Sequence, residues 1–122
     1  AVREALRRLL LANNGAEPDP EAIATLNTAA RVAPLRVRFG ADGAAQLAPA
    51  TDGVPAAIGV LLGIVSRAMA DGTWERLKAC PGDDCLWAFY DHSRNRSKQW
   101  CRMEVCGNRA KARAYRERRR GG

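Results

Sequence analysis

Two short stretches decide the fold of the C-terminal part of this chain: Cys80-Pro81-Gly82-Asp83-Asp84-Cys85 and Cys101-Arg102-Met103-Glu104-Val105-Cys106. They hold all four cysteines of the 122-residue sequence. Two close pairs separated by a hairpin-length interval are typical of a tetrahedral zinc site, because each short loop brings two thiolates to one side of the ion. Pro81-Gly82 lets the first loop turn tightly, so that backbone N–H groups can point at sulfur. The spacing therefore predicts one structural zinc ion.

Other uses of the four cysteines fit less well. Two disulfides would suit a small secreted chain, but the N-terminus lacks the charged, apolar and small-residue order of a signal peptide. An iron–sulfur cluster also takes four thiolates. Redox catalysis would favour a two-residue gap, whereas both gaps here are four residues long. His92, the single histidine, is interpreted as part of a polar hairpin tip, because four thiolates already complete the shell.

The sequence around the cysteines predicts a treble-clef-like module over residues 73–122. Strands are expected at 73–79, 86–90 and 98–102, and a strongly helix-forming run follows Gly107. Cys106 would then lie at the helix N-terminus, where the helix dipole stabilises a thiolate. Four aromatic residues are expected to form the small core of the module, with stacking on unpaired bases as the alternative: Trp87, Phe89, Tyr90 and Trp100.

The positive charge of the chain is concentrated at its C-terminal end. The whole sequence has 20 Lys+Arg and 13 Asp+Glu, a formal net charge of +7. Residues 1–90 hold 9 basic and 10 acidic residues, whereas residues 91–122 hold 11 basic and 3 acidic residues. Such an asymmetric block favours a surface that binds a polyanion, and a solvated basic tail is the alternative.

A helix beginning near Gly107 would carry a stripe of arginines at positions i, i+4, i+7 and i+11: Arg109, Arg113, Arg116 and Arg120. Such a stripe can neutralise phosphates and release their counterions. The predicted nucleic-acid-binding residues are Arg94, Arg96, Lys98, Arg102, Arg109, Lys111, Arg113, Arg116 and Arg120. Ala110 and Ala114 lie on another side and are expected to pack on the sheet. Asn108 is predicted to fix the turn after Cys106, and for Arg109 both roles stay open.

Residues 1–72 predict a small, mostly helical domain with a β-hairpin, which makes the whole chain α+β. Helices are expected at 2–12, 20–32 and 55–70, with hairpin strands at 35–39 and 45–48. The second helix is expected to bury Ile23, Leu26 and Ala30. Gly59 and Gly63 favour close packing over a ligand pocket.

The start of the sequence and the length of its longest apolar stretch lead to two further expectations. The sequence opens without Met and already in helical register, so we expect it to begin inside a longer native domain. The longest weakly charged apolar stretch, Val54 to Val65, is shorter than the roughly 20 residues that cross a bilayer. A cytoplasmic protein with no membrane partner is therefore expected.

The run Cys101-x4-Cys106-Gly107-Asn108-Arg109, preceded by Cys80-x4-Cys85 and Trp87, resembles the CGNR zinc-finger family of bacteria. The resemblance covers about residues 73–120. In that family the finger follows an N-terminal domain called ABATE, and the proteins are described as stress-induced transcription regulators. The resemblance implies zinc on Cys80, Cys85, Cys101 and Cys106, and nucleic-acid binding by the finger.

These observations favour a zinc-binding, DNA-binding transcription regulator. Its N-terminal domain would sense an unidentified small-molecule effector or form a homodimer. The alternatives are a protein-interaction adaptor that grips an acidic partner, and an RNA-binding protein. An enzyme is not expected, because the sequence has no HExxH, GxSxG or phosphate-loop motif and four thiolates leave no open metal position. Asp83 and Asp84 are interpreted as neighbours of the metal and not as a catalytic dyad.

Overall fold

The computed structural model describes residues 1–82 and 85–121, and it has the predicted α+β fold. Its contacts divide the chain into two compact units. The first unit comprises Ala1–Ala5 and Pro20–Trp74, and the second comprises Leu6–Asp19 and Glu75–Gly122. The division passes through the first helix, α1 (Val2–Ala12). The predicted domains, 1–72 and 73–122, stay a prediction.

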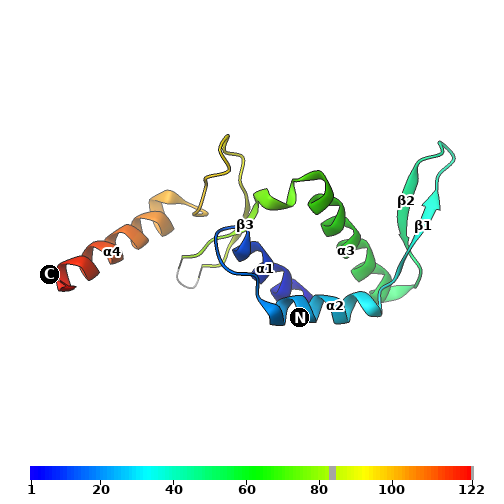
Figure 1. Cartoon of the computed structure of the whole chain (residues 1–122), viewed down its shortest axis with the longest axis horizontal. Helices are drawn as coiled ribbons and strands as arrows, with labels where there is room; N and C mark the ends of the chain where they lie inside the picture. The colour runs from blue at the N-terminus through cyan, green and yellow to red at the C-terminus, as the bar shows by residue number, and fades with distance from the viewer. Residues whose placement is uncertain (83–84, 122) are drawn as a thin grey trace. The chain divides into compact units, whose positions relative to one another are not determined.

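The first unit consists of two helices and the hairpin that connects them. Its elements are α2 (Pro20–Arg31), β1 (Leu35–Phe39), β2 (Ala45–Pro49) and α3 (Gly53–Asp71). The strands are antiparallel, with Leu35 opposite Pro49 and Phe39 opposite Ala45. The hairpin projects from the place where α2 and α3 meet (Figure 1). All four elements were predicted, and α3 ends as expected at Asp71, before Gly72, whose φ of 83° is left-handed.

Leu35, the first residue of β1, packs closely on α3. A Cβ atom at Gly59 would lie 3.1 Å from Leu35 Cδ2 and 3.2 Å from the carbonyl oxygen of Ala33. A Cβ atom at Gly63 would lie 3.2 Å from Leu35 Cδ1. The two glycines therefore let Leu35 approach the helix, which confirms the interpretation that they serve close packing.

The prediction for the buried face of α2 was wrong. Ala22 is buried, whereas Ile23 and Ala30 are exposed and Leu26 is half-buried. The helix is rotated by about one residue, or 100°, from the orientation that its larger side chains favour. The small side chain of Ala22 allows a closer approach of the neighbouring backbone than Ile23 would.

Helix α3 is the one helix in the described chain that is long and apolar enough, by length and composition, to cross a membrane. The apolar stretch counted from the sequence ended at Val65, but the helix continues to Asp71 and its mean hydropathy reaches 1.7. The core helix of a soluble protein can meet the same criterion. The expected absence of a membrane partner therefore stays a prediction.

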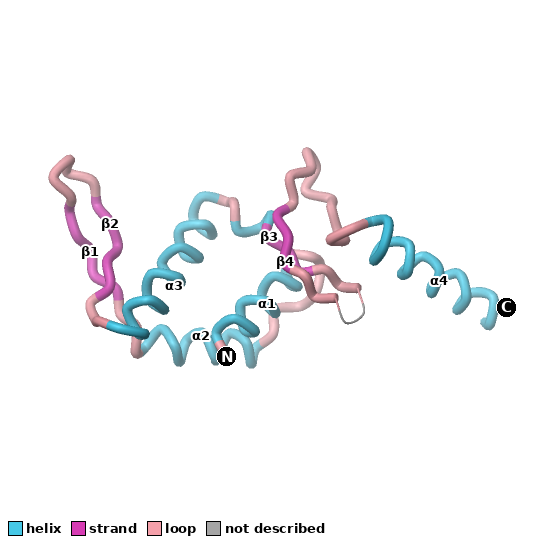
Figure 2. The backbone as a smooth tube through the Cα atoms, turned by 180° about the vertical axis from the view of Figure 1, so that it is seen from behind, coloured by secondary structure: helices cyan, strands magenta, loops and turns pink. Residues whose placement is uncertain are grey.

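The second unit is built around a short hairpin followed by a long terminal helix. Besides the C-terminal part of α1, it contains η1 (Trp74–Arg76, whose first residue belongs to the first unit), β3 (Leu77–Ala79), β4 (Ala88–Tyr90), η2 (Met103–Gly107) and α4 (Asn108–Gly121). Strands β3 and β4 pair antiparallel. Helix α4 extends away from this hairpin (Figure 2). Helix α4 begins at Asn108, one residue after Gly107, near which the sequence predicted its start.

The predicted third strand, at residues 98–102, was wrong. Residues 98–102 are irregular, and the second sheet has two strands in the part of the chain that the structure describes. The Lys78 ammonium explains this difference, because it donates hydrogen bonds to the carbonyl oxygens of Arg96 at 2.8 Å and Lys98 at 2.7 Å. These carbonyl groups bind a side chain in place of a neighbouring strand.

Lys78 also forms a buried ion pair with Asp91. Its Nζ lies 2.9 Å from Asp91 Oδ2, and the two side chains are 6% and 0% exposed. Asp91 accepts further hydrogen bonds from the backbone N–H groups of Ser93 and Lys98. Burial alone would raise the pKa of Asp91, but hydrogen bonds from Ser93 and Lys78 outweigh burial and lower this pKa below its usual value. The pair holds the loop between β4 and the second cysteine pair.

Replacing Asp91 by Asn should lower the free energy of unfolding of the zinc-loaded protein by about 3–5 kcal/mol, because the Lys78 ammonium stays buried without a counter-charge. Urea unfolding measures this change. The deficit should stay constant from about pH 6 to about pH 8, where zinc remains bound, since an aspartate with a lowered pKa contributes fully above its unfolded pKa of about 3.9.

The control for this experiment is Glu75→Gln. It breaks the exposed 2.7 Å pair between Glu75 and Arg96 and should cost less than about 1 kcal/mol. Equal decreases in the free energy of unfolding in the two variants would show that the buried Lys78–Asp91 pair contributes no more stability than the exposed pair.

Candidate metal centre

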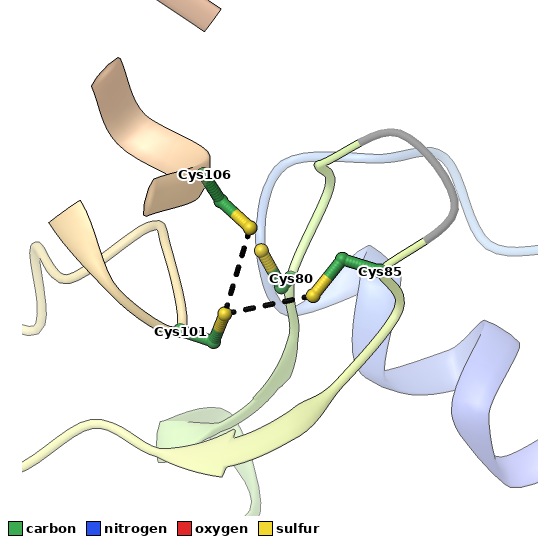
Figure 3. Close-up of side chains that lie close together, drawn as sticks. All are labelled: Cys80, Cys85, Cys101 and Cys106. Carbon is green, nitrogen blue, oxygen red and sulfur yellow. Dashed lines mark hydrogen bonds between the residues drawn. The ribbon is translucent and has the colours of Figure 1, made fainter. Parts of the chain in front are cut away.

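The four cysteine sulfurs converge on one point in the second unit (Figure 3). All four Sγ atoms lie within 4.8 Å of one another. The Sγ of Cys101 is 3.5 Å from that of Cys85 and 3.7 Å from that of Cys106. Sulfurs placed 2.3 Å from a tetrahedral zinc ion are about 3.8 Å apart. The cluster therefore has the size and the donor chemistry of a four-thiolate zinc site.

Two structural elements place the first cysteine pair. Cys80 directly follows β3, and its N–H donates to the Trp87 carbonyl oxygen at 2.9 Å, which extends the β3–β4 pairing. The N–H of Cys85 donates to the Gly82 carbonyl oxygen at 3.1 Å. A Cβ atom on Gly82 would lie 3.0 Å from Cys106 Sγ and 3.4 Å from Cys80 Sγ. Glycine at this position therefore lets the first loop close over the sulfurs.

The second pair surrounds the start of η2. The N–H groups of Cys106 and Gly107 both donate to the Arg102 carbonyl oxygen, at 3.0 and 3.3 Å. Cys106 belongs to η2, which leads directly into α4 at Asn108. The fourth ligand thus lies at the N-terminal end of the terminal helix, as the sequence predicted, and the helix dipole there favours a thiolate.

The thiol groups differ in their electrostatic surroundings. Burial raises the pKa of Cys106 to about 12, and burial also raises that of Cys101. A hydrogen bond from the Trp87 backbone instead lowers the pKa of Cys85. A zinc ion offsets the burial penalty with its own charge, and zinc binding must then release protons from the buried thiols.

His92, Asp83, Asp84 and Trp87 lie close to the cysteines in the sequence. His92 is exposed in the irregular segment that follows β4, and its ring centroid lies 4.6 Å from that of Tyr90. The hairpin tip expected there was wrong, because no strand follows at residues 98–102. Asp83 and Asp84 lie outside the described residues. The expected core position of Trp87 was wrong, because its side chain is 69% exposed. The Trp87 backbone is held by Cys80 and Cys85 while the ring points outward.

All nine predicted nucleic-acid-binding residues are exposed, and they divide into two groups. Arg94, Arg96, Lys98 and Arg102 lie in the loop and on the approach to η2, and Arg109, Lys111, Arg113, Arg116 and Arg120 lie on α4. In the first group, Arg96 pairs with Glu75 and Lys98 lies over the Phe89 ring, 5.2 Å from its centroid.

Arg109 and Arg113 line a hollow of about 260 Å³ between the first cysteine loop and α4. Trp100 forms another part of its wall. Ala110 and Ala114 also line this hollow, so the expectation that they pack on the sheet was wrong. Among the described residues, this sheet consists of β3 and β4, and α4 extends away from it (Figure 2).

Asn108 has the structural surroundings that the sequence suggested. Its side-chain amide donates to the Glu104 carbonyl oxygen at 3.3 Å, which ties the start of α4 back to η2.

Sequence reasoning missed two asparagines that attach the end of α1 to the zinc-site hairpin. The amide of Asn13 donates to the Leu77 carbonyl oxygen at 2.8 Å. The amide of Asn14 donates to the carbonyl oxygens of Ala79 at 3.2 Å and Gln99 at 2.7 Å. The sequence Asn13-Asn14-Gly15 predicts the end of a helix, and Gly15 has the left-handed backbone, with a φ of 97°, that such an end uses. No local signal could show what the amides would bind.

Gly82→Ala should weaken zinc binding by about tenfold or more, as changes around a metal's ligands do, because the added methyl group would press on the sulfurs of Cys106 and Cys80. Competition with a chromophoric chelator measures the affinity. The matched control is Gly121→Ala, where a Cβ atom meets no other atom within 4 Å. Unchanged affinity in Gly82→Ala would refute the close approach.

Cys106→Ala should reduce the zinc content well below one ion per chain, because three thiolates leave the tetrahedral shell open. Elemental analysis of the purified protein checks this. Retention of one tightly held zinc ion would show that Cys106 is not a ligand.

Two family models match the chain, and no curated protein matches it. The CGNR zinc finger model matches residues 76–119, which include all four cysteines. The ABATE model, described as "Putative stress-induced transcription regulator", matches residues 1–73. The cysteine cluster and the finger match together identify one structural zinc site. The order of the two matches is the one that the sequence resemblance implied, and the chain belongs to the ABATE family with a C-terminal CGNR zinc finger.

Proposed function

We propose that this chain is a DNA-binding transcription regulator in which zinc holds the finger in shape and α4 contacts DNA. The observation that carries the proposal is the composition and exposure of α4. Seven of its residues are basic and one is acidic. Every residue of the helix is exposed except Ala110, which is half-buried. The helix is therefore a positively charged rod with little apolar surface to bury.

The distribution of charge on α4 suits a nucleic-acid groove. Arg109 and Arg120 mark the ends of the arginine stripe, which is about 16 Å long. Lys111 and Arg118 lie on the opposite side of the helix. A helix in the major groove has phosphates on both flanks, so charge on several faces can be neutralised at once. Two arginines of the stripe, Arg109 and Arg113, also line the hollow beside Trp100, near the first cysteine loop.

The metal site supports a binding role over a catalytic one. Four cysteine ligands fill a tetrahedral zinc shell and leave no position for a reacting water. We therefore propose that the protein is not an enzyme, that it works in the bacterial cytoplasm, and that the first unit senses an effector or dimerises. The stress response named for the family is part of the same proposal.

Trp87 favours a second candidate, binding of single-stranded RNA or DNA. Its indole ring is 69% exposed, more than the 52% of Tyr115 on α4. Exposed aromatic rings beside basic residues stack on unpaired bases. This candidate predicts that a single strand binds more tightly than a duplex and that Trp87→Ala removes the preference.

The proposed role of α4 predicts that Arg113→Gln together with Arg116→Gln weakens binding to duplex DNA while zinc is retained. In a plot of the logarithm of the binding constant against the logarithm of salt concentration, the slope should become less negative by about 1.8, because two phosphate contacts are lost. Fluorescence anisotropy with labelled duplexes over a salt series measures both quantities.

The control removes the same charge elsewhere, with Arg36→Gln and Arg38→Gln on the exposed face of β1. That variant should bind DNA like the wild type. Binding that does not depend on salt, or equal losses in both variants, would exclude α4 as the contact surface.

A further inference from the structure

The hollow beside Trp100 is open because small residues line it. Ala110 and Ala114 lie one turn apart on the same face of α4 and form part of its wall. Gly82, in the first cysteine loop, lies in another part of the wall. Longer side chains at these positions would fill the space, which has a volume of about 260 Å³. The residues all belong to the second unit, so the metal that fixes the cysteine loop also fixes the shape of the hollow.

The wall of the hollow combines an aromatic residue with positive charge. Trp100 lines it and is half-buried. Arg109 and Arg113 line it one helical turn apart, and both are exposed. A guanidinium carries five N–H donors in a planar fork that matches a phosphate, so it can hold a ligand while it also contacts a neighbour. Nucleotides bind such surfaces, because the base stacks on the aromatic ring and the phosphate pairs with arginine.

The size of the hollow limits what can enter it. Pockets for drug-sized molecules have volumes of roughly 300–1,000 Å³, and this hollow lies just below that range. One small molecule, or one residue of a longer polymer, therefore fits better than a helix or a folded peptide segment.

The charges along the hollow give a bound nucleotide a direction. Among the described residues that line it, Glu117 is the acidic one, and it lies about 12 Å along α4 from Arg109. Its carboxylate repels a phosphate but accepts hydrogen bonds from the exocyclic amino group of a base. The phosphate is therefore expected at the two arginines, with the polar edge of the base nearer Glu117.

We propose that this hollow binds one nucleotide, with its base beside Trp100 and its phosphate at Arg109 and Arg113. The same chemistry is present in a free nucleoside monophosphate and in an unpaired nucleotide of a nucleic-acid strand. For a nucleotide within a strand, the inference rests on the nucleic-acid binding proposed for α4. For a free nucleotide it does not.

The first experiment titrates the zinc-loaded protein with adenosine 5′-monophosphate in a calorimeter. Adenosine and ribose 5-phosphate serve as probes of the two parts of the ligand, and each should bind at least about tenfold more weakly than the whole nucleotide, because each lacks one of the two contacts.

Ala114→Leu should weaken binding of adenosine 5′-monophosphate by about tenfold or more, because leucine fills the hollow without changing the charge of α4. The matched control is Ala112→Leu, the same substitution on α4 at an exposed residue that does not line the hollow. It should bind like the wild type. Zinc content and circular dichroism should be equal in all three proteins.

The second experiment tests a nucleotide within a strand. Fluorescence anisotropy compares three labelled DNA duplexes of one sequence: a fully paired duplex, one with a single bulged deoxyadenosine, and one with an abasic residue at the same bulge. The bulged deoxyadenosine should bind about tenfold more tightly than both other duplexes, because stacking on Trp100 requires the base. Ala112→Leu should keep this preference, and Ala114→Leu should lose it.

Binding of adenosine 5′-monophosphate that Ala114→Leu weakens supports a free nucleotide as the ligand. A preference for the bulged deoxyadenosine that Ala114→Leu removes supports a nucleotide within a strand. The absence of both signals in the wild type would overturn the proposal, as would signals that persist unchanged in Ala114→Leu. A protein that binds no paired duplex contradicts the function proposed for α4, and the calorimetric titration then decides the inference alone.

Discussion

The second unit depends on bringing four thiolates to one point. Its buried apolar residues are few: Leu10 on α1, and Ala79, Cys80 and Cys106 around the hairpin. So little apolar burial supplies little of the free energy that ordering the chain requires. Zinc binding can provide it, because the ion joins the end of β3 to the start of α4 and stabilises thiolates that burial would otherwise keep protonated. The position of the basic helix therefore follows from the metal site.

Much of this site could be predicted because its signals are local. The cysteine spacing indicated the metal, and the run after Gly107 indicated a helix that starts beside the last ligand. The predicted strand at 98–102 failed because the competing interaction came from Lys78, a distant residue whose charge must be satisfied inside the fold. The burial of Asp91 and the outward position of Trp87 also arise from tertiary contacts. The pattern of apolar and polar residues in the sequence does not predict them.

The two units use their surfaces in opposite ways. In α4 the exposed residues are almost all basic, so the surface attracts polyanions and repels another copy of itself. In α3 the exposed residues are aliphatic and uncharged over most of the helix, so the surface has no attraction for phosphate. The mean composition of the chain conceals this contrast. Only the position of each residue along the sequence, combined with its exposure, separates the strongly basic surface of α4 from the uncharged aliphatic surface of α3.

The amide contacts of Asn13 and Asn14 have a consequence for how the protein is made. Residues 6–19 leave the ribosome long before Cys80–Cys106, yet they complete their packing only against the hairpin that carries the first cysteines. The N-terminal segment must therefore wait for the last third of the chain and for its metal. Metal supply during synthesis would then govern the maturation of residues 6–19 and of the zinc-site hairpin together.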